Sequence, residues 1–200
     1  MSFNKINFLS ISINDTQSII KALDTKMGFL IALLSLPFTN LHKIISHLYL
    51  FVQCGSTNAT IVWSYVIIII FTLLWLLAFY ISVRGILAIG NPSNNVNNDL
   101  SANGSFYSGY LFRYSLKDGL IHNRSNIATK KLSEQIKLIP EAEENIIIEL
   151  TYEQMKLAYI RDVKIHRLHS SFWILVYWLL TGFIIYFNNY YCSVNHLMKW

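Results

Sequence analysis

Four basic side chains between residues 106 and 140 are the best candidates for binding chemistry in this sequence. Arg113, Arg124, Lys130 and Lys131 lie in a segment that begins with the aromatic-rich run FYSGYLFRYS. Arginine pairs well with phosphate, often through two parallel hydrogen bonds. If the chain binds a phosphate-bearing ligand, we therefore expect these four residues to hold it.

Other chemistry has little support. The sequence contains no GxSxG, HExxH, GxGxxG or Walker motif, which are the common signatures of nucleophilic, metal-dependent and nucleotide-binding sites. His166 and His169 are three residues apart in a predicted helix. Such a pair can bind a metal, but next to an apolar segment it is more typical of an interfacial position. We expect no enzymatic activity, no metal and no cofactor.

The longest apolar run dominates the fold prediction. No charged residue occurs from Ile61 to Val83, and a helix needs about 20 apolar residues to cross a bilayer core of roughly 30 Å. A chain of 200 residues has little core in which to bury such a helix on every side. Charged residues make up only 14% of the chain, against about 25% in soluble domains. The run therefore predicts a transmembrane helix.

A second apolar segment, residues 27–52, is less regular because Pro37, Asn40, His42 and Lys43 interrupt it. The part before Pro37 is too short to cross a membrane alone. Proline and polar residues are tolerated in membrane helices where they face protein or water. We expect the whole segment to form a transmembrane helix, and a re-entrant or interfacial segment is the alternative.

The last third of the sequence predicts a long helix. Apolar and aromatic residues recur every three or four positions from Ile148 to Val163, which is typical of one helix face. This helix becomes basic near its end and is expected to continue into 171–187, an uncharged stretch just long enough to span.

The sequence therefore predicts an all-α membrane protein with an N-terminal transmembrane hairpin and a third transmembrane helix. Its expected parts are a cytoplasmic N-terminal helix (1–26), the hairpin (27–87), a small, mainly helical cytoplasmic segment (88–170) with a long helix (141–170), the third transmembrane helix (171–187) and an external tail (188–200).

The distribution of basic residues predicts the orientation. Lysines precede the first apolar segment and ten Lys or Arg lie between Arg84 and the last one, whereas residues 53–60 have none and only Lys199 follows Phe187. Cytoplasmic loops carry an excess of Lys and Arg. We expect a multi-pass protein of the cell membrane with a cytoplasmic N-terminus and an external C-terminus.

The two cysteines, Cys54 and Cys192, would then both face the oxidising side of the membrane, where a disulfide can persist. Nothing in the sequence places them within bonding distance of each other.

Short motifs occur in a fixed order along these elements. The run LDTKMG, residues 23–28, precedes the first apolar segment, and the long helix carries Glu149-Leu150, Gln154-Met155 and Lys164. In this order, over about residues 15–187, the chain resembles the transmembrane effectors of bacterial Pycsar antiphage systems. Their pattern is L-D-x-K-A-G at the first membrane helix and D-L…Q-I…K before the last. Methionine replaces the alanine, glutamate the aspartate and methionine the isoleucine of that pattern.

The resemblance implies a role in abortive infection. In that family a partner cyclase makes a cyclic pyrimidine mononucleotide during phage infection, the effector is switched on in the inner membrane, and the cell dies as membrane integrity is lost. The implied partners are the cyclic mononucleotide and the lipid bilayer. Further copies of the chain are also expected, because three helices cannot enclose a wide aqueous path. The net charge of +5 lies beside apolar segments, so no nucleic-acid partner is expected.

Seven ionisable residues within or beside the apolar segments are further site candidates, for gating or for contact with the membrane surface: Asp24, Lys26, His42, Lys43, Arg161, Lys164 and Arg167. Because a charge in lipid is costly, His42 and Lys43 either line a pore or a helix contact, or lie near the membrane surface. Asp24 and Lys26 form either an interfacial charge pair or a gating or assembly contact. The last three suit anionic headgroups, at about 1 kcal/mol each, or a nucleotide phosphate.

Two other functions fit the same sequence. One is a small membrane scaffold or accessory subunit that anchors a soluble partner. The other is a constitutive ion channel, which would leak without any trigger.

Overall fold

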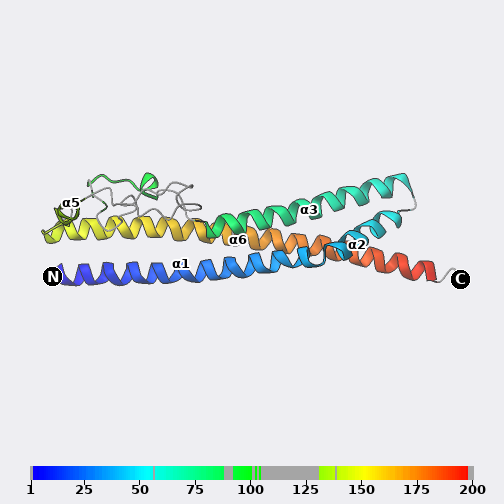
Figure 1. The fold of residues 1–200 in the computed structure, drawn as a ribbon, viewed down its shortest axis with the longest axis horizontal. Helices are drawn as coiled ribbons and strands as arrows, with labels where there is room; N and C mark the ends of the chain where they lie inside the picture. The colour runs from blue at the N-terminus through cyan, green and yellow to red at the C-terminus, as the bar shows by residue number, and fades with distance from the viewer. Residues whose placement is uncertain are drawn as a thin grey trace. The chain divides into compact units, whose positions relative to one another are not determined.

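The computed structural model describes residues 2–55, 57–87, 92–100, 102, 104, 131–137 and 139–197. All regular structure in these ranges is helical (Figure 1). The elements are α1 (Ser2–Thr39), α2 (Leu41–Gln53), α3 (Asn58–Ile86), the short 3-10 helix η1 (Pro92–Asn95), α5 (Leu132–Lys137) and α6 (Glu143–Leu197). The predicted all-α class is therefore confirmed for this part of the chain.

The chain divides into two compact units. Unit 1 comprises the described parts of Met1–Ile19 and Ile89–Arg161, and unit 2 those of Ile20–Ala88 and Asp162–Trp200. Helices α1 and α6 contribute residues to both units. The elements with a membrane-like composition belong mainly to unit 2.

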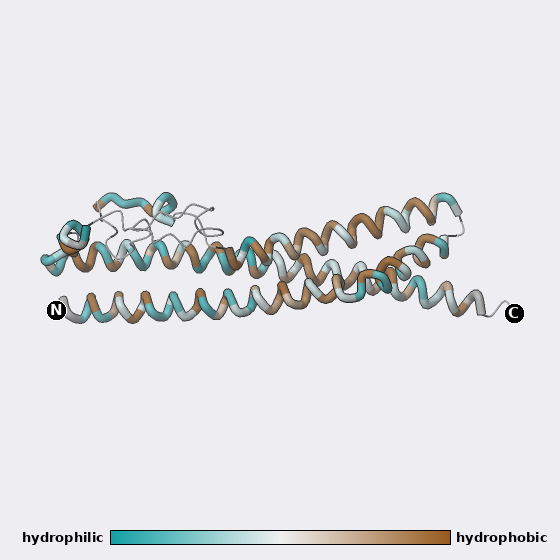
Figure 2. Tube along the Cα trace, viewed as in Figure 1, coloured by the Kyte–Doolittle hydropathy of each residue, from teal (hydrophilic) through white to brown (hydrophobic). Residues whose placement is uncertain are grey.

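Among the residues that the structure describes, two helices are long and apolar enough to cross a membrane: Asn58–Ile86 and the stretch Glu143–Val194 of α6. Figure 2 shows hydrophobic residues dominating α3. The 29 residues of α3 extend about 43 Å at 1.5 Å per residue, more than the roughly 30 Å of a bilayer core. In the most apolar 18-residue stretch of each helix, only 11% of α3 and 17% of α6 are buried in the protein. The core helix of a soluble protein would be mostly buried, so these helices fit a lipid environment better.

The prediction of one helix over residues 27–52 is wrong. Helix α1 continues past residue 26, where the N-terminal helix was expected to end, and runs to Thr39. The helix is then interrupted at Asn40, before α2 begins. The physical cause is Pro37, which lacks the N–H that would bond to the carbonyl of the preceding turn. Near this position the indole N–H of Trp75 donates to Leu34 O at 2.9 Å. This bond lies one residue from Leu33, whose carbonyl loses its helical donor to Pro37, and it ties α1 to α3 beside the interruption.

Within unit 2, α1 packs against α3 and α6 through a narrow face. Leu23, Met27, Leu30 and Leu34 are buried at spacings of three and four residues, which places them on one side of α1. Leu30 and Leu34 join Ala78 of α3 and Leu175 of α6 in one core cluster. This core fixes the C-terminal half of α1 beside the two apolar helices.

Small residues on α3 allow this close approach. Ala78, Ser82 and Gly85 are all buried and share one face of the helix. A β-carbon at Gly85 would collide with the side chain of Met27, which fills the space there. Small residues at such contacts are how membrane helices come close together.

A disulfide joins Cys54, directly after α2, to Cys192 near the end of α6. Their Cα atoms are 6.0 Å apart, and the side-chain amide of Asn189 donates to His47 O at 2.9 Å nearby. Sequence reasoning left this bridge open. It fixes the connection between α2 and α3 to the last turns of α6.

We expect this bridge to be present in membranes of expressing cells. Cys54→Ser should remove about 2–4 kcal/mol of stability and lower the thermal unfolding midpoint, while the neighbouring exposed Ser193→Ala should not. Reducing and non-reducing gels should show different mobilities for the wild type. Alkylation of both thiols without a reductant would contradict the bridge.

Candidate functional site

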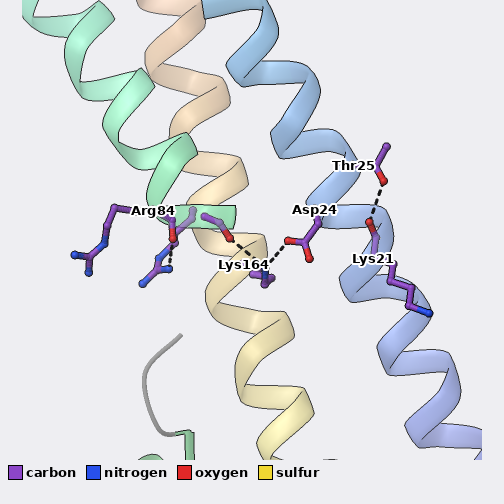
Figure 3. Close-up of polar contacts among 7 residues, drawn as sticks. Lys21, Asp24, Thr25, Arg84 and Lys164 are labelled. Atoms are coloured by element: carbon purple, nitrogen blue, oxygen red, sulfur yellow. Dashed lines mark hydrogen bonds and ion pairs between the residues drawn. The ribbon is translucent and has the colours of Figure 1, made fainter. Parts of the chain in front are cut away.

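Three helices of unit 2 meet around one buried ammonium group. Lys164 on α6 is 5% exposed, and Figure 3 shows its side chain reaching toward Asp24 of α1. Its Nζ forms an ion pair with the Asp24 carboxylate and donates to Gly85 O, in the last turn of α3, at 3.2 Å. We call these three residues the Lys164 junction.

The junction has a clear electrostatic basis. The last carbonyls of a helix have no partners within the helix, and the negative end of the helix dipole attracts a cation. Lys164 supplies that cation at the end of α3. A buried ammonium is unfavourable unless it is paired and hydrogen-bonded, and Asp24 provides the pairing charge. The Asp24 side chain is 40% exposed, so water screens part of the attraction at that end.

Two further side chains extend the polar contact along α6. Arg167 donates through Nη1 to Arg84 O at 2.6 Å. Ser171 donates to Ala78 O at 3.1 Å and its oxygen lies 2.5 Å from the Ser82 hydroxyl. Because the single hydroxyl proton of Ser171 goes to the carbonyl, Ser82 donates to Ser171.

Lys164, Arg167 and Ser171 lie at spacings of three and four residues, on one face of α6. Each of them contacts α3. Interhelical hydrogen bonds in membranes contribute about 0.6 kcal/mol on average. These three contacts therefore determine the register of α3 against α6 more than they add to the stability of the protein.

The structure brings only some of the predicted site residues together. Asp24 and Lys164 meet, although they are 140 residues apart in sequence. The headgroup contact expected for Lys164 does not fit its burial. The guanidinium of Arg167 is hydrogen-bonded to α3. Arg161, in unit 1, is half-buried. Lys26 is exposed and, with Phe29 and Phe172, lines an apolar groove of about 750 Å³ between α1 and α6.

The predicted phosphate-binding set falls largely outside the described residues. Arg113, Arg124 and Lys130 lie there, so their arrangement is not part of the structure. Lys131 is exposed, and its backbone N–H donates to the Glu134 carboxylate at 3.3 Å at the start of α5. A ligand could reach its side chain from solvent.

His166 and His169, the histidine pair noted in the sequence, are both exposed on α6. The Nε2 atom of His169 accepts a hydrogen bond from the Trp173 indole at 3.0 Å. In the part of the chain that the structure describes, no three potential metal ligands lie together.

Unit 1 holds the other residues of the resemblance motifs. The side-chain amide of Gln154 donates to Ser12 Oγ at 2.6 Å, which links α6 to α1 within this unit. Glu149 is 4% exposed. Sequence reasoning missed Lys156, which is 4% exposed, pairs with Glu153 at 2.5 Å and lies over the Tyr152 ring. The sequence did offer a signal for this pair, because a glutamate and a lysine three residues apart on a predicted helix can form an ion pair.

Comparison with protein families, with curated proteins and with solved structures gives no match for this chain. What the structure defines is a class: an all-helical protein, over its described residues, with two helices long and apolar enough to cross a membrane. Any more particular function has to be argued from the Lys164 junction and its surroundings.

Proposed function

We propose that the chain is a membrane effector of bacterial antiphage defence. A cyclic pyrimidine mononucleotide from a partner cyclase switches it on, and it then disrupts the membrane of the infected cell. The observation that carries this proposal is the ion pair between Asp24 and Lys164. These are two charged residues of the motifs on which the resemblance rests, and they meet where α1, α3 and α6 are joined within unit 2.

A pair of this kind suits a switch. A resting effector must be harmless, so its closed state must dominate. Moving a two-state equilibrium from 1:99 to 99:1 requires about 5.5 kcal/mol of differential binding. Removing one partner of a buried ion pair costs about 3–5 kcal/mol, and solvent at Asp24 reduces this figure. The free energy that the Lys164 junction gives to the closed state is therefore comparable with the differential binding energy that a ligand must supply.

The proposed topology has three spans, with the N-terminus in the cytoplasm and the C-terminus outside. α3 and α6 supply two crossings. The third consists of the apolar end of α1 together with α2, interrupted at Asn40. The disulfide between Cys54 and Cys192 supports it, because disulfides persist on the oxidising side. Reporter fusions after Ser105 and after Trp200 test it, and reporters active on the same side would refute it.

The ligand is proposed to bind the basic residues before α5. Replacing Lys130 and Lys131 together with glutamate should weaken ligand-triggered killing, because reversed charge repels phosphate. Membrane insertion should be unchanged, since Lys131 is exposed. Colony counts with a co-expressed cyclase measure the effect, and Lys5→Glu, an exposed lysine of the same unit, is the control. Equal killing by both variants would count against this pair.

The whole proposal is tested by expressing the chain with and without a pyrimidine cyclase and measuring dye entry and membrane potential. Depolarisation that requires the cyclase is the expected result. Depolarisation without it would favour the constitutive channel. An intact membrane in the presence of the cyclic nucleotide would favour the scaffold.

A further inference from the structure

Helix α2 has two unlike faces. Ile44, Leu48, Phe51 and Val52 are buried or half-buried, at the spacing of one helix face. The opposite face is exposed and mostly polar, although Leu50 also lies on it. Its polar members are His42, Lys43, Ser46, Tyr49 and Gln53. We call these five residues the α2 polar face.

The cavity beside α2 gives the depth of this face. Ile44 lines the same cavity as Phe71 of α3 and Trp178 of α6. Phe71 lies ten residues after Ile61 and twelve before Val83, the ends of the uncharged run. At 1.5 Å per residue it is about 15 Å or more from either end. Lys43, next to Ile44, therefore lies near the middle of the apolar layer.

An ammonium group at this depth is unfavourable in lipid. Insertion scales give about 2.5–3.5 kcal/mol for lysine at the centre of a membrane helix. Lys43 is exposed and, among the residues that the structure describes, has no hydrogen-bond or ion-pair partner. Its four-carbon stem is too short to carry the charge to the membrane surface. The single chain thus leaves a cation where neither water nor a counter-charge reaches it.

We propose that the α2 polar faces of several copies of this chain line a water-filled path through the membrane. This inference rests on the proposed function and says how the membrane is breached. The uncharged runs 61–83 and 171–187 of another copy offer no carboxylate to Lys43, so its charge must be solvated by water. Two lysines in direct contact would repel, which excludes a dry dimer through this face. A ring of lysines around water admits anions.

The test uses the full-length chain in proteoliposomes, without cyclase or nucleotide, because Lys43 needs water in the closed state as well and the closure of the path must then lie elsewhere along it. Ser46→Cys places a thiol on the α2 polar face, and the native cysteines are held in their disulfide. Ile69→Cys is the matched control, because Ile69 is 57% exposed at a similar depth on α3. A charged methanethiosulfonate reagent should modify position 46 and not position 69. Mild oxidation should cross-link copies through position 46 alone.

The outcomes separate the alternatives. Modification at neither position, or equally at both, would overturn the proposal. Cross-linking at position 46 without modification would mean a dry contact between copies and would also overturn it. Because no trigger is needed, a negative result here leaves cyclase-dependent killing untouched. Conversely, a lack of cyclase-dependent killing would leave a positive labelling result intact.

Discussion

Cells that express the Lys164→Met variant should die without any cyclase. The change leaves the Asp24 carboxylate and the carbonyl of Gly85 without the cation that joins them. Because water can solvate the partly exposed Asp24 carboxylate, we expect a loss of about 2 kcal/mol from the closed state, which would raise the open population roughly 30-fold. Colony formation after induction, in a strain with no pyrimidine cyclase, measures the effect.

Two further variants sharpen this test. Asp24→Asn keeps an acceptor for Lys164 but leaves the buried ammonium without its counter-charge, so this variant should also be toxic without a cyclase. Lys21→Met removes an exposed lysine of α1 that is not among the site candidates and should stay harmless. The amount of each variant in the membrane has to be measured in parallel. A Lys164→Met protein that accumulates at wild-type levels and stays harmless would exclude the junction as the switch.

Gly85→Ala should destabilise the protein by about 1–3 kcal/mol, the usual cost of overpacking a close contact. The added methyl group meets the side chain of Met27. Met27→Ala alone removes a fully buried side chain and should cost about 2–5 kcal/mol. In the double variant the methyl group occupies space that the methionine vacates, so the two losses should not add.

Thermal unfolding of the four proteins in detergent provides this double-mutant cycle. Gly28→Ala is the control, because a β-carbon there meets nothing within 4 Å. If the Gly85 and Met27 effects were strictly additive, the two residues would not be in contact. The pair also gives a structural meaning to Met27, which stands where the resembled pattern has alanine: its extra volume is accommodated by a glycine on α3.

The sequence predicted the helical class and the position of α3, because both follow from local patterns. An uncharged run of this length and a repeat of three to four residues are visible without tertiary information. The break at Asn40 was harder to predict. A proline within a membrane helix often causes only a kink, and what happens there depends on which groups of a neighbouring helix can bond to the freed backbone.

The site was predicted only in part. Asp24 and Lys164 were both candidates, but their pairing depends on how α1 and α6 lie side by side. Ser82 and Ser171 were missed because a small hydroxyl within an apolar helix has no distinctive pattern. Their bond becomes visible only when the two helices are placed in register. The disulfide was left open for the same reason, since no local rule brings Cys54 near Cys192.

That disulfide determines where the apolar helices can separate. With the end of α6 covalently attached beside the start of α3, the two helices cannot part there and can only pivot. From Cys192 to Lys164 is 28 residues along α6, or about 42 Å, so a tilt of about 10° would displace the far end by roughly 7 Å. In such a tilt the disulfide would be the fixed point, so the largest displacement would fall at the Lys164 junction. Reducing the disulfide would remove this fixed point without changing any residue of the proposed ligand site.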